Sequence, residues 1–172
     1  MRIRGLHQLT RLLSMAAPTH TALADAAPNG AFQRAASGHR SIVAEDSDFP
    51  PESGRYHLYV AHACPWANRC SAMLKLKKLE QHIGLSVVHP TWQRTKPEVD
   101  DHAGWVFRSP SDPPVVPLSG FGEIPCSDCI PDTVNGAKTV RELYDLAGDT
   151  FKKYSVPVFW DKKKNTIGDW QQ

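Results

Sequence analysis

The sequence has few cysteines, no long apolar run and no strong excess of either charge. Four cysteines among 172 residues are too few for a dense disulfide framework, so reduced thiols in an intracellular protein are expected. No apolar run approaches the roughly 18 residues that a membrane-spanning helix needs. The 20 Lys and Arg residues against 18 Asp and Glu residues do not produce the basic surface of a nucleic-acid-binding protein. The sequence therefore predicts a single domain with extensions that binds neither nucleic acid nor membrane.

The N-terminal segment, residues 1–24, is basic and has no acidic residue before Asp25. Its apolar residues recur at helical spacing among arginines, which is typical of an organelle transit peptide, although a disordered tail has the same composition. Residues 25–54 are rich in Ala, Gly, Pro and Ser and are expected to form an extended arm. We therefore expect a cytoplasmic protein, or a mitochondrial or plastid one if residues 1–24 are a transit peptide.

The folded part is expected to span residues 55–172, with an irregular, proline-rich insertion over residues 91–135. Period-two and helical patterns predict the order β-α-β-α-β-β, which indicates an α/β fold. The expected strands and helices, in chain order, are 55–61, 66–79, 83–90, 135–148, 155–161 and a hairpin partner after 161.

Within the second expected helix, Arg141 and Asp145 lie one turn apart and are expected to form an ion pair. Gly148 is well placed to end this helix. The final hairpin needs an element to cover its outer face, and no residues follow to provide one. We therefore expect an exposed apolar patch on this hairpin.

Cys64 lies where a strand should turn into a helix, directly before Pro65. The unpaired N–H groups at a helix N-terminus favour the thiolate form of a thiol, and proline suits the first helical position. Ala67 stands where a dithiol exchanger has its second cysteine, so Cys64 needs a resolving thiol from elsewhere. A buried turn cysteine with only a packing role is the alternative.

Pro157 follows Val156 at the start of an expected strand, where a missing N–H is tolerated. In thioredoxin-like folds this proline is cis and lies beside the reactive cysteine, and the backbone of the preceding residue pairs with a peptide-like thiol. The positions of Cys64 and Pro157 in the β-α-β-α-β order therefore favour a thioredoxin-like fold. The alternative is a proline that merely begins a strand.

The motif CSDC, from Cys126 to Cys129, lies inside the insertion and not at a strand-to-helix turn. A zinc site needs four ligands, and no second CxxC or spaced histidine pair lies near it in sequence. We therefore expect an incidental pair or a local disulfide, and no metal centre. Cys70 lies about 120° around the helix from Cys64 and is expected to point into the core.

Residues 49–69, FPPESGRYHLYVAHACPWANR, closely resemble the active-site segment of glutathionyl-hydroquinone reductases, the xi-class and omega-like glutathione transferases, in which CPWAHR is usual. The runs SVVHP, GWVF, NGAKTVRELYDLA and VPVFWDKKKNTI follow in the family's order. The resemblance covers roughly residues 30–167. It implies a thioredoxin-like glutathione transferase N-terminal domain and a glutathione-dependent reductase.

By this resemblance, Cys64 would be the catalytic thiol that removes glutathione from a glutathionyl-hydroquinone and is then resolved by a second glutathione. Trp105 would pack against glutathione, and Val156, beside Pro157, would hydrogen-bond its backbone. Lys153 would supply the cation that faces a glutathione carboxylate. Glutathione is thus implied as co-substrate, quinone or hydroquinone adducts as partners, and no metal.

The sequence departs from the family at its end, where Gln171 and Gln172 stand in place of a Glu-Ser pair that holds the γ-glutamyl group. Asn68 also replaces the family's histidine. The last thioredoxin-fold helix and the all-α C-terminal domain, which closes the hydroquinone pocket and forms the dimer, do not follow. We therefore expect a truncated chain with impaired activity and a doubtful homodimer. The alternatives are a non-enzymatic or unstable interaction module and a glutaredoxin-like deglutathionylase.

Overall fold

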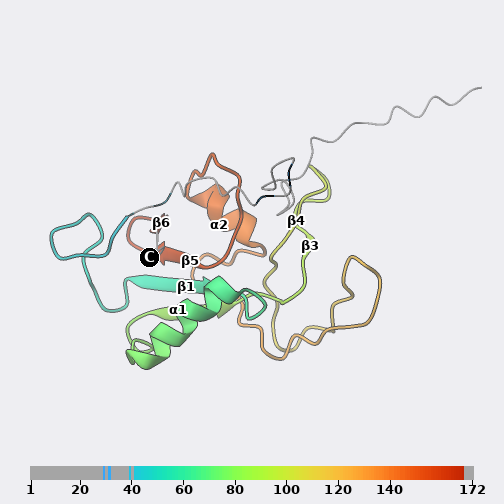
Figure 1. The fold of residues 1–172 in the computed structure, drawn as a ribbon, viewed down its shortest axis with the longest axis horizontal. Helices are drawn as coiled ribbons and strands as arrows, with labels where there is room; N and C mark the ends of the chain where they lie inside the picture. The colour runs from blue at the N-terminus through green and yellow to red at the C-terminus, as the bar shows by residue number, and fades with distance from the viewer. Residues whose placement is uncertain (1–28, 30, 32–38, 40, 169–172) are drawn as a thin grey trace, which may run out of the picture.

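The computed structural model describes residues 29, 31, 39 and 41–168. The expectations for residues 1–24, for most of the arm before residue 41, and for Gln171 and Gln172 lie outside these described residues. Figure 1 shows a small sheet with one helix on each side and a long insertion that extends away from it.

The central sheet has the strand order β2-β1-β5-β6. Strand β1 runs parallel to β2, and β5 is antiparallel to both of its neighbours. The bounds of the main elements are β1 (Tyr56–Val60), α1 (Pro65–Leu76), β2 (Gly84–Val87), α2 (Val140–Leu146), β5 (Val158–Asp161) and β6 (Thr166–Gly168). The predicted β-α-β-α-β-β order is thus confirmed for the main elements.

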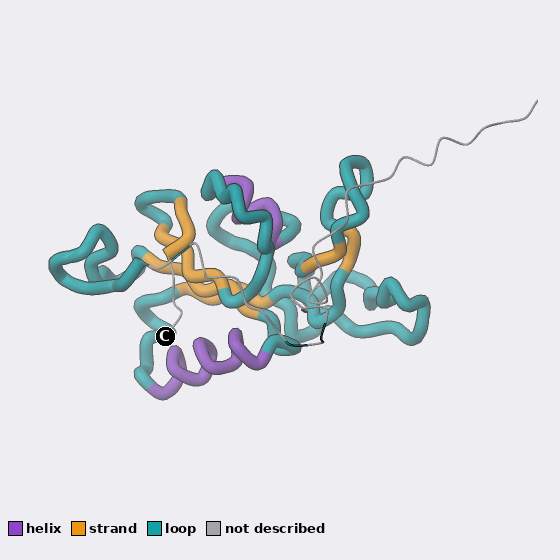
Figure 2. The backbone as a smooth tube through the Cα atoms, turned by 45° about the horizontal axis from the view of Figure 1, so that its top comes forward, coloured by secondary structure: helices purple, strands orange, loops and turns teal. Residues whose placement is uncertain are grey.

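Helices α1 and α2 lie on opposite sides of the sheet in Figures 1 and 2. Both faces of the sheet are therefore covered, which is why all five residues of β1 and all four of β5 are buried. Helix α1 buries Ala67, Cys70 and Leu74 against this core. Cys70 is only 8% exposed, which confirms that its thiol belongs to the core.

Helix α1 ends at Leu76, three residues before the predicted end. Lys77 forms the C-cap, and Lys78 adopts a left-handed conformation with φ of 55°, which breaks the helical repeat. Leu79 still packs against the core although it lies beyond the helix. The apolar spacing therefore predicted the helix, but among the residues that define the spacing only Cys70 and Leu79 face the core. Trp66, Met73 and Leu76 are 53%, 40% and 76% exposed.

Helix α2 begins at Val140, later than predicted, because Thr139 caps it. The Glu142 amide donates to Thr139 Oγ1 over 3.2 Å, and the Glu142 carboxylate accepts from the Lys138 amide over 2.6 Å. At the other end Gly148 has φ of 70° and follows the C-cap, as predicted.

The predicted ion pair between Arg141 and Asp145 is wrong. Arg141 donates instead to both carboxylate oxygens of Asp100, each over 2.7 Å, and Asp145 accepts from Lys96 over 2.6 Å. Arg141 is buried because α2 turns this residue toward the segment around Asp100. A bidentate pair with a fixed carboxylate is stronger than a solvated pair along one helix.

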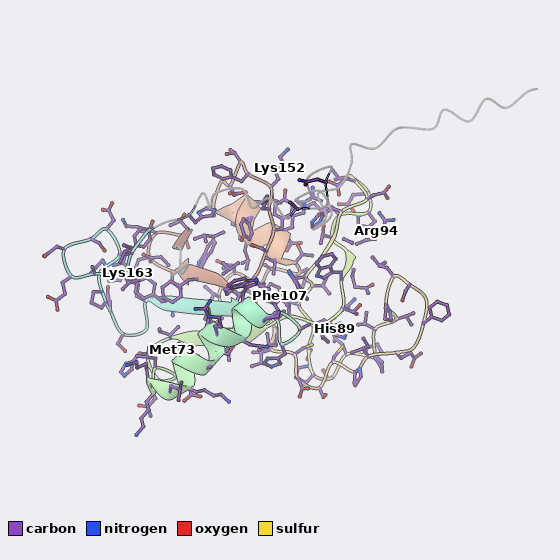
Figure 3. The ribbon with its side chains drawn as sticks, in the orientation of Figure 1. Met73, His89, Arg94, Phe107, Lys152 and Lys163 are labelled. Atoms are coloured by element: carbon purple, nitrogen blue, oxygen red, sulfur yellow. The ribbon has the colours of Figure 1, made fainter. Side chains whose placement is uncertain are left out.

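The insertion, residues 91–135, is largely irregular as predicted, but it is tied to the rest of the fold at several points. It contains the two-residue strands β3 (Gln93–Arg94) and β4 (Ala103–Gly104), which pair with one another. Isolated bridges join Val87 to Ile130, Val106 to Thr139 and Val115 to Ile124. Figure 3 labels His89 near the point where the insertion leaves the sheet and Lys163 in the turn between β5 and β6 at the far end.

Within the described residues, the final hairpin does not have the exposed apolar patch that the sequence predicted. Trp160 and Ile167, which pair across β5 and β6, are 0% and 6% exposed. In the segment before β1, Phe49 packs against the core, and Lys164 Nζ lies 4.7 Å from the centroid of the Phe49 ring. Within the described part of the chain, no helix is both long and apolar enough to cross a membrane.

Candidate active site

Cys64 is the N-cap residue of α1, and Pro65 is at the first helical position. The Cys64 amide donates to Ala61 O over 3.0 Å, and the Asn68 amide donates to Cys64 O over 3.0 Å, so backbone bonds hold the residue from both sides. The thiol is half-buried. The strand-to-helix turn that the sequence predicted is therefore present, and its sulfur is reachable from solvent.

The Cys64 thiol donates to the backbone oxygen of Val156 over 3.5 Å, across a sequence separation of 92 residues. The peptide bond between Val156 and Pro157 is cis. Val156 is buried, and β5 begins directly after Pro157. The sequence placed Cys64 and Pro157 at one site, and the structure brings Cys64 and the Val156–Pro157 pair together.

Asn68 takes part in the turn that presents Cys64. Its side-chain amide donates to His62 O over 3.0 Å, which ties the first turn of α1 to the loop before it. His62 itself is exposed. The replacement of the family's histidine by Asn68 therefore leaves a side chain that can fasten this loop.

Trp105 follows β4 and lies in the segment that pairs with the start of α2. Its backbone oxygen accepts from the Val140 amide over 3.0 Å. Its half-buried ring packs against the main core and meets Trp92 edge-on, with the ring centroids 5.6 Å apart. The indole of Trp105 is thus held between the core and a second indole.

Lys153 lies in the loop between α2 and β5, three residues before Val156. Its backbone oxygen accepts from the Ser155 amide over 2.8 Å, and its side chain is half-buried. Tyr144 on α2 donates to Ser155 O over 3.0 Å and so fixes the end of this loop. Lys153 and Trp105 therefore come from segments that are both bonded to α2.

A polar cluster that was not predicted from the sequence lies beside these two segments. Besides its bidentate bond to Asp100, Arg141 lies 5.3 Å from the ring centroid of Tyr154, and His102 meets the same ring edge-on at 5.0 Å. The His102 ring is also hydrogen-bonded to Thr95 Oγ1 over 2.8 Å. The partners are more than 35 residues from Arg141 in sequence, apart from Tyr154, so no local pattern could have found them.

Within the described residues, no three or more His, Cys, Asp or Glu side chains lie together in a way that could hold a metal ion. Cys126 and Cys129 belong to a separate small cluster with Val115, away from the core that includes Cys64. Cys64 and the CSDC motif therefore lie in two separate parts of the molecule.

Comparison with known proteins agrees with this geometry. The glutathionyl-hydroquinone reductase PcpF of Sphingobium chlorophenolicum is 33% identical over 139 residues, which are 80% of this chain and 36% of that protein. The glutathionyl-hydroquinone reductase YqjG of Escherichia coli is 35% identical over 147 residues, which are 80% of this chain and 38% of that protein. This chain belongs to the glutathionyl-hydroquinone reductase family, the xi class of glutathione transferases.

Solved structures support the same family and fold. The xi glutathione transferase ECM4 from Saccharomyces cerevisiae, in complex with glutathione, is 28% identical with a TM-score of 0.63, over 81% of this chain and 43% of that one. Glutathione-bound YqjG is 34% identical with a TM-score of 0.58, over 76% of this chain and 38% of that one. No protein-family model matches the chain. This xi-class chain spans between 36% and 43% of the length of the curated relatives it matches.

Proposed function

We propose that this xi-class chain exchanges its Cys64 thiol with glutathione conjugates, the sulfur chemistry of glutathionyl-hydroquinone reduction. The observation that carries the proposal is the position of Cys64 Sγ, at the N-terminus of α1 and 3.5 Å from Val156 O. The thiol thus lies at a helix N-terminus and beside backbone that can pair with a peptide. The names of the relatives support the substrate class.

In the first step, the Cys64 thiolate attacks the glutathione sulfur of a glutathionyl-hydroquinone. The bond between that sulfur and the ring carbon breaks, its electron pair stays on the ring carbon, and the carbon takes up a proton. Hydroquinone leaves, and glutathione remains on Cys64 as a mixed disulfide. In the second step, the thiolate of a second glutathione attacks the glutathione sulfur of this mixed disulfide, which restores Cys64 and forms glutathione disulfide.

The binding roles that we propose are those that the family resemblance implies. Val156, beside Pro157, would offer its backbone to the cysteinyl part of glutathione, since it already adjoins the thiol. The half-buried Trp105 ring would pack against the tripeptide. Lys153, from the adjoining loop, would face a glutathione carboxylate. Each role remains a prediction for this chain.

The decisive test follows glutathione onto Cys64 in the purified chain. After incubation with glutathione disulfide and digestion with trypsin, the peptide of residues 56–69 contains Cys64 and no other cysteine. We expect this peptide to gain one glutathione, and we expect the purified chain to release hydroquinone from a glutathionyl-hydroquinone when reduced glutathione is present. Both signals should be lost in Cys64→Ser.

The matched control is Cys70→Ala, which removes a buried cysteine from the same helix. It should retain both signals. Equal loss in the two variants would contradict a specific role for Cys64. Release of glutathione from a glutathionylated peptide but not from the aryl thioether would instead identify a glutaredoxin-like deglutathionylase.

A further inference from the structure

Cys126 and Cys129 occupy the two ends of a tight turn in the insertion. The Cys129 amide donates to Cys126 O over 2.9 Å, with Ser127 and Asp128 exposed at the corner. The first and last Cα atoms of a β-turn lie within about 7 Å of one another. Disulfides span Cα separations of about 4.4–6.8 Å. The backbone of this turn therefore already has the separation that a disulfide requires.

Both thiols point inward, and they form a small core of their own. Cys126 and Cys129 are each 2% exposed and cluster with Val115. The Cys126 thiol donates to Pro113 O over 3.4 Å. Because the two free thiols share one small buried cluster, they can form a disulfide without a rearrangement of the backbone.

The turn lies between two backbone pairings, one within the insertion and one to the sheet. On one side Ile124 pairs with Val115, and on the other Ile130 pairs with Val87 of β2 through two hydrogen bonds of 2.9 Å. A covalent link across the turn would shorten the flexible chain between these two pairings. It would therefore restrict the motion of the turn that lies directly before the pairing of Ile130 with Val87.

We propose that Cys126 and Cys129 are a dithiol that glutathione disulfide oxidises to an intramolecular disulfide, which locks the turn beside the pairing of Ile130 with β2. This site goes beyond the proposed function, because it does not use Cys64. One cysteine thiolate attacks a sulfur of glutathione disulfide and releases one glutathione thiolate. The second cysteine thiolate then attacks the protein sulfur of the mixed disulfide and releases the other. Two cysteine protons pass to the two glutathiones, and two electrons pass with them.

Burial affects how fast this step runs. Burial, together with the neighbouring Cys126, raises the pKa of the Cys129 thiol to about 11. Only a thiolate attacks a disulfide, so the oxidation should accelerate as the pH rises from neutral toward that value. A metal-binding role is less suited to the pair, since no third ligand joins it among the described residues.

The test uses the full chain carrying Cys64→Ser, so that the outcome does not depend on the proposed catalytic thiol. The native protein is incubated with mixtures of reduced and oxidised glutathione, alkylated and digested with trypsin. The peptide of residues 109–138 contains Cys126 and Cys129 and neither of the other cysteines. We expect this peptide to lose two hydrogen atoms and to resist alkylation, in proportion to the oxidised fraction of glutathione.

Two further variants, Cys126→Ser and Cys129→Ser in the same background, cannot close the disulfide. In each, the same peptide should instead gain one glutathione. In the oxidised parent protein, amide hydrogen exchange within this peptide should be slower than in the reduced protein. The proposal is overturned if the peptide stays reduced in the native protein and oxidises only in denaturant, or if oxidation leaves its hydrogen exchange unchanged.

Discussion

Arg141 and Asp100 connect two segments that are far apart in sequence but flank the candidate site. The Arg141 side chain is 10% exposed and the Asp100 side chain 29%, and they meet through two hydrogen bonds of 2.7 Å. The Arg141 guanidinium, helped by the His102 amide, lowers the pKa of Asp100 to about 2. The ionised carboxylate is therefore favoured by the folded state.

We predict that Asp100→Asn destabilises the chain at neutral pH by about 1–2 kcal/mol, the range for a charged hydrogen bond in partial contact with water. Because the pKa of Asp100 falls from 3.8 to about 2 on folding, its contribution is complete above pH 3.8 and is lost as the pH falls toward 2. Urea unfolding from pH 7 down to acid should therefore show the two proteins converging below about pH 4.

Asp101→Asn is the matched control. Asp101 pairs with Arg94, and both side chains are well exposed, so we expect a loss below about 1 kcal/mol. Equal losses for the two variants, or a difference from the wild type that persists unchanged at pH 2, would show that the Asp100 carboxylate is not specially stabilised by folding.

Strands β1 and β2 are packed so closely that one position between them has no room for a side chain. His57 in β1 pairs with Gly84 in β2, and a Cβ added at Gly84 would lie 2.3 Å from His57 Nδ1. The His57 ring cannot easily move, because its Nε2 atom is hydrogen-bonded to Ser86 Oγ over 2.8 Å and the residue is 4% exposed. Burial also lowers the pKa of His57 to about 4, so the ring is neutral in the folded protein.

We predict that Gly84→Ala destabilises the chain by about 1–3 kcal/mol, the usual cost of overpacking a filled core. The measurement is the midpoint of thermal or urea unfolding followed by circular dichroism. The β1–β2 pairing should be the part affected, so amide exchange in both strands should become faster.

Gly168→Ala provides the comparison, because Gly168 is also a strand glycine of the same sheet. An added Cβ there meets its nearest atom at 3.6 Å, which is ordinary contact. We expect this change to be neutral or slightly stabilising, since alanine restricts the unfolded chain. A Gly84→Ala protein as stable as Gly168→Ala would mean that the His57 ring moves aside freely.

At the scale of the whole molecule, Asp132 attaches the end of the long insertion to the sheet. Asp132, which is 7% exposed, accepts from the Tyr59 hydroxyl in the middle of β1 over 2.8 Å. Its carboxylate also accepts from the backbone amides of Val134, Asn135 and Ala137. One buried carboxylate thus joins the central strand to the segment that leads into α2.

We predict that Asp132→Ala destabilises the chain by roughly 3 kcal/mol, because it leaves several buried donors without an acceptor. Faster hydrogen exchange should extend from residues 132–139 into β1. Glu123→Ala, an exposed acid within the same insertion, should change the unfolding free energy by less than about 0.5 kcal/mol. A local effect limited to residues 132–139 would show that the insertion folds independently of the sheet.

Local patterns in the sequence were sufficient to predict the order of the main elements and the turn at Cys64. Strand alternation, helical spacing and proline positions act over a few residues, and so they are visible without the fold. The ends of the helices were harder to predict. The left-handed Lys78 ended α1 early, and the cap formed by Thr139 delayed α2.

Sequence patterns alone were enough to predict the turn at Cys64, the proline before β5 and the family to which the chain belongs. The pairing of Arg141 with Asp100, the burial of the final hairpin and the shared cluster of Cys126 and Cys129 became visible only in the folded chain. The physical reason is the range of the interactions. Helix caps and strand alternation depend on near neighbours, whereas ion pairs and burial depend on which distant segments the fold brings into contact.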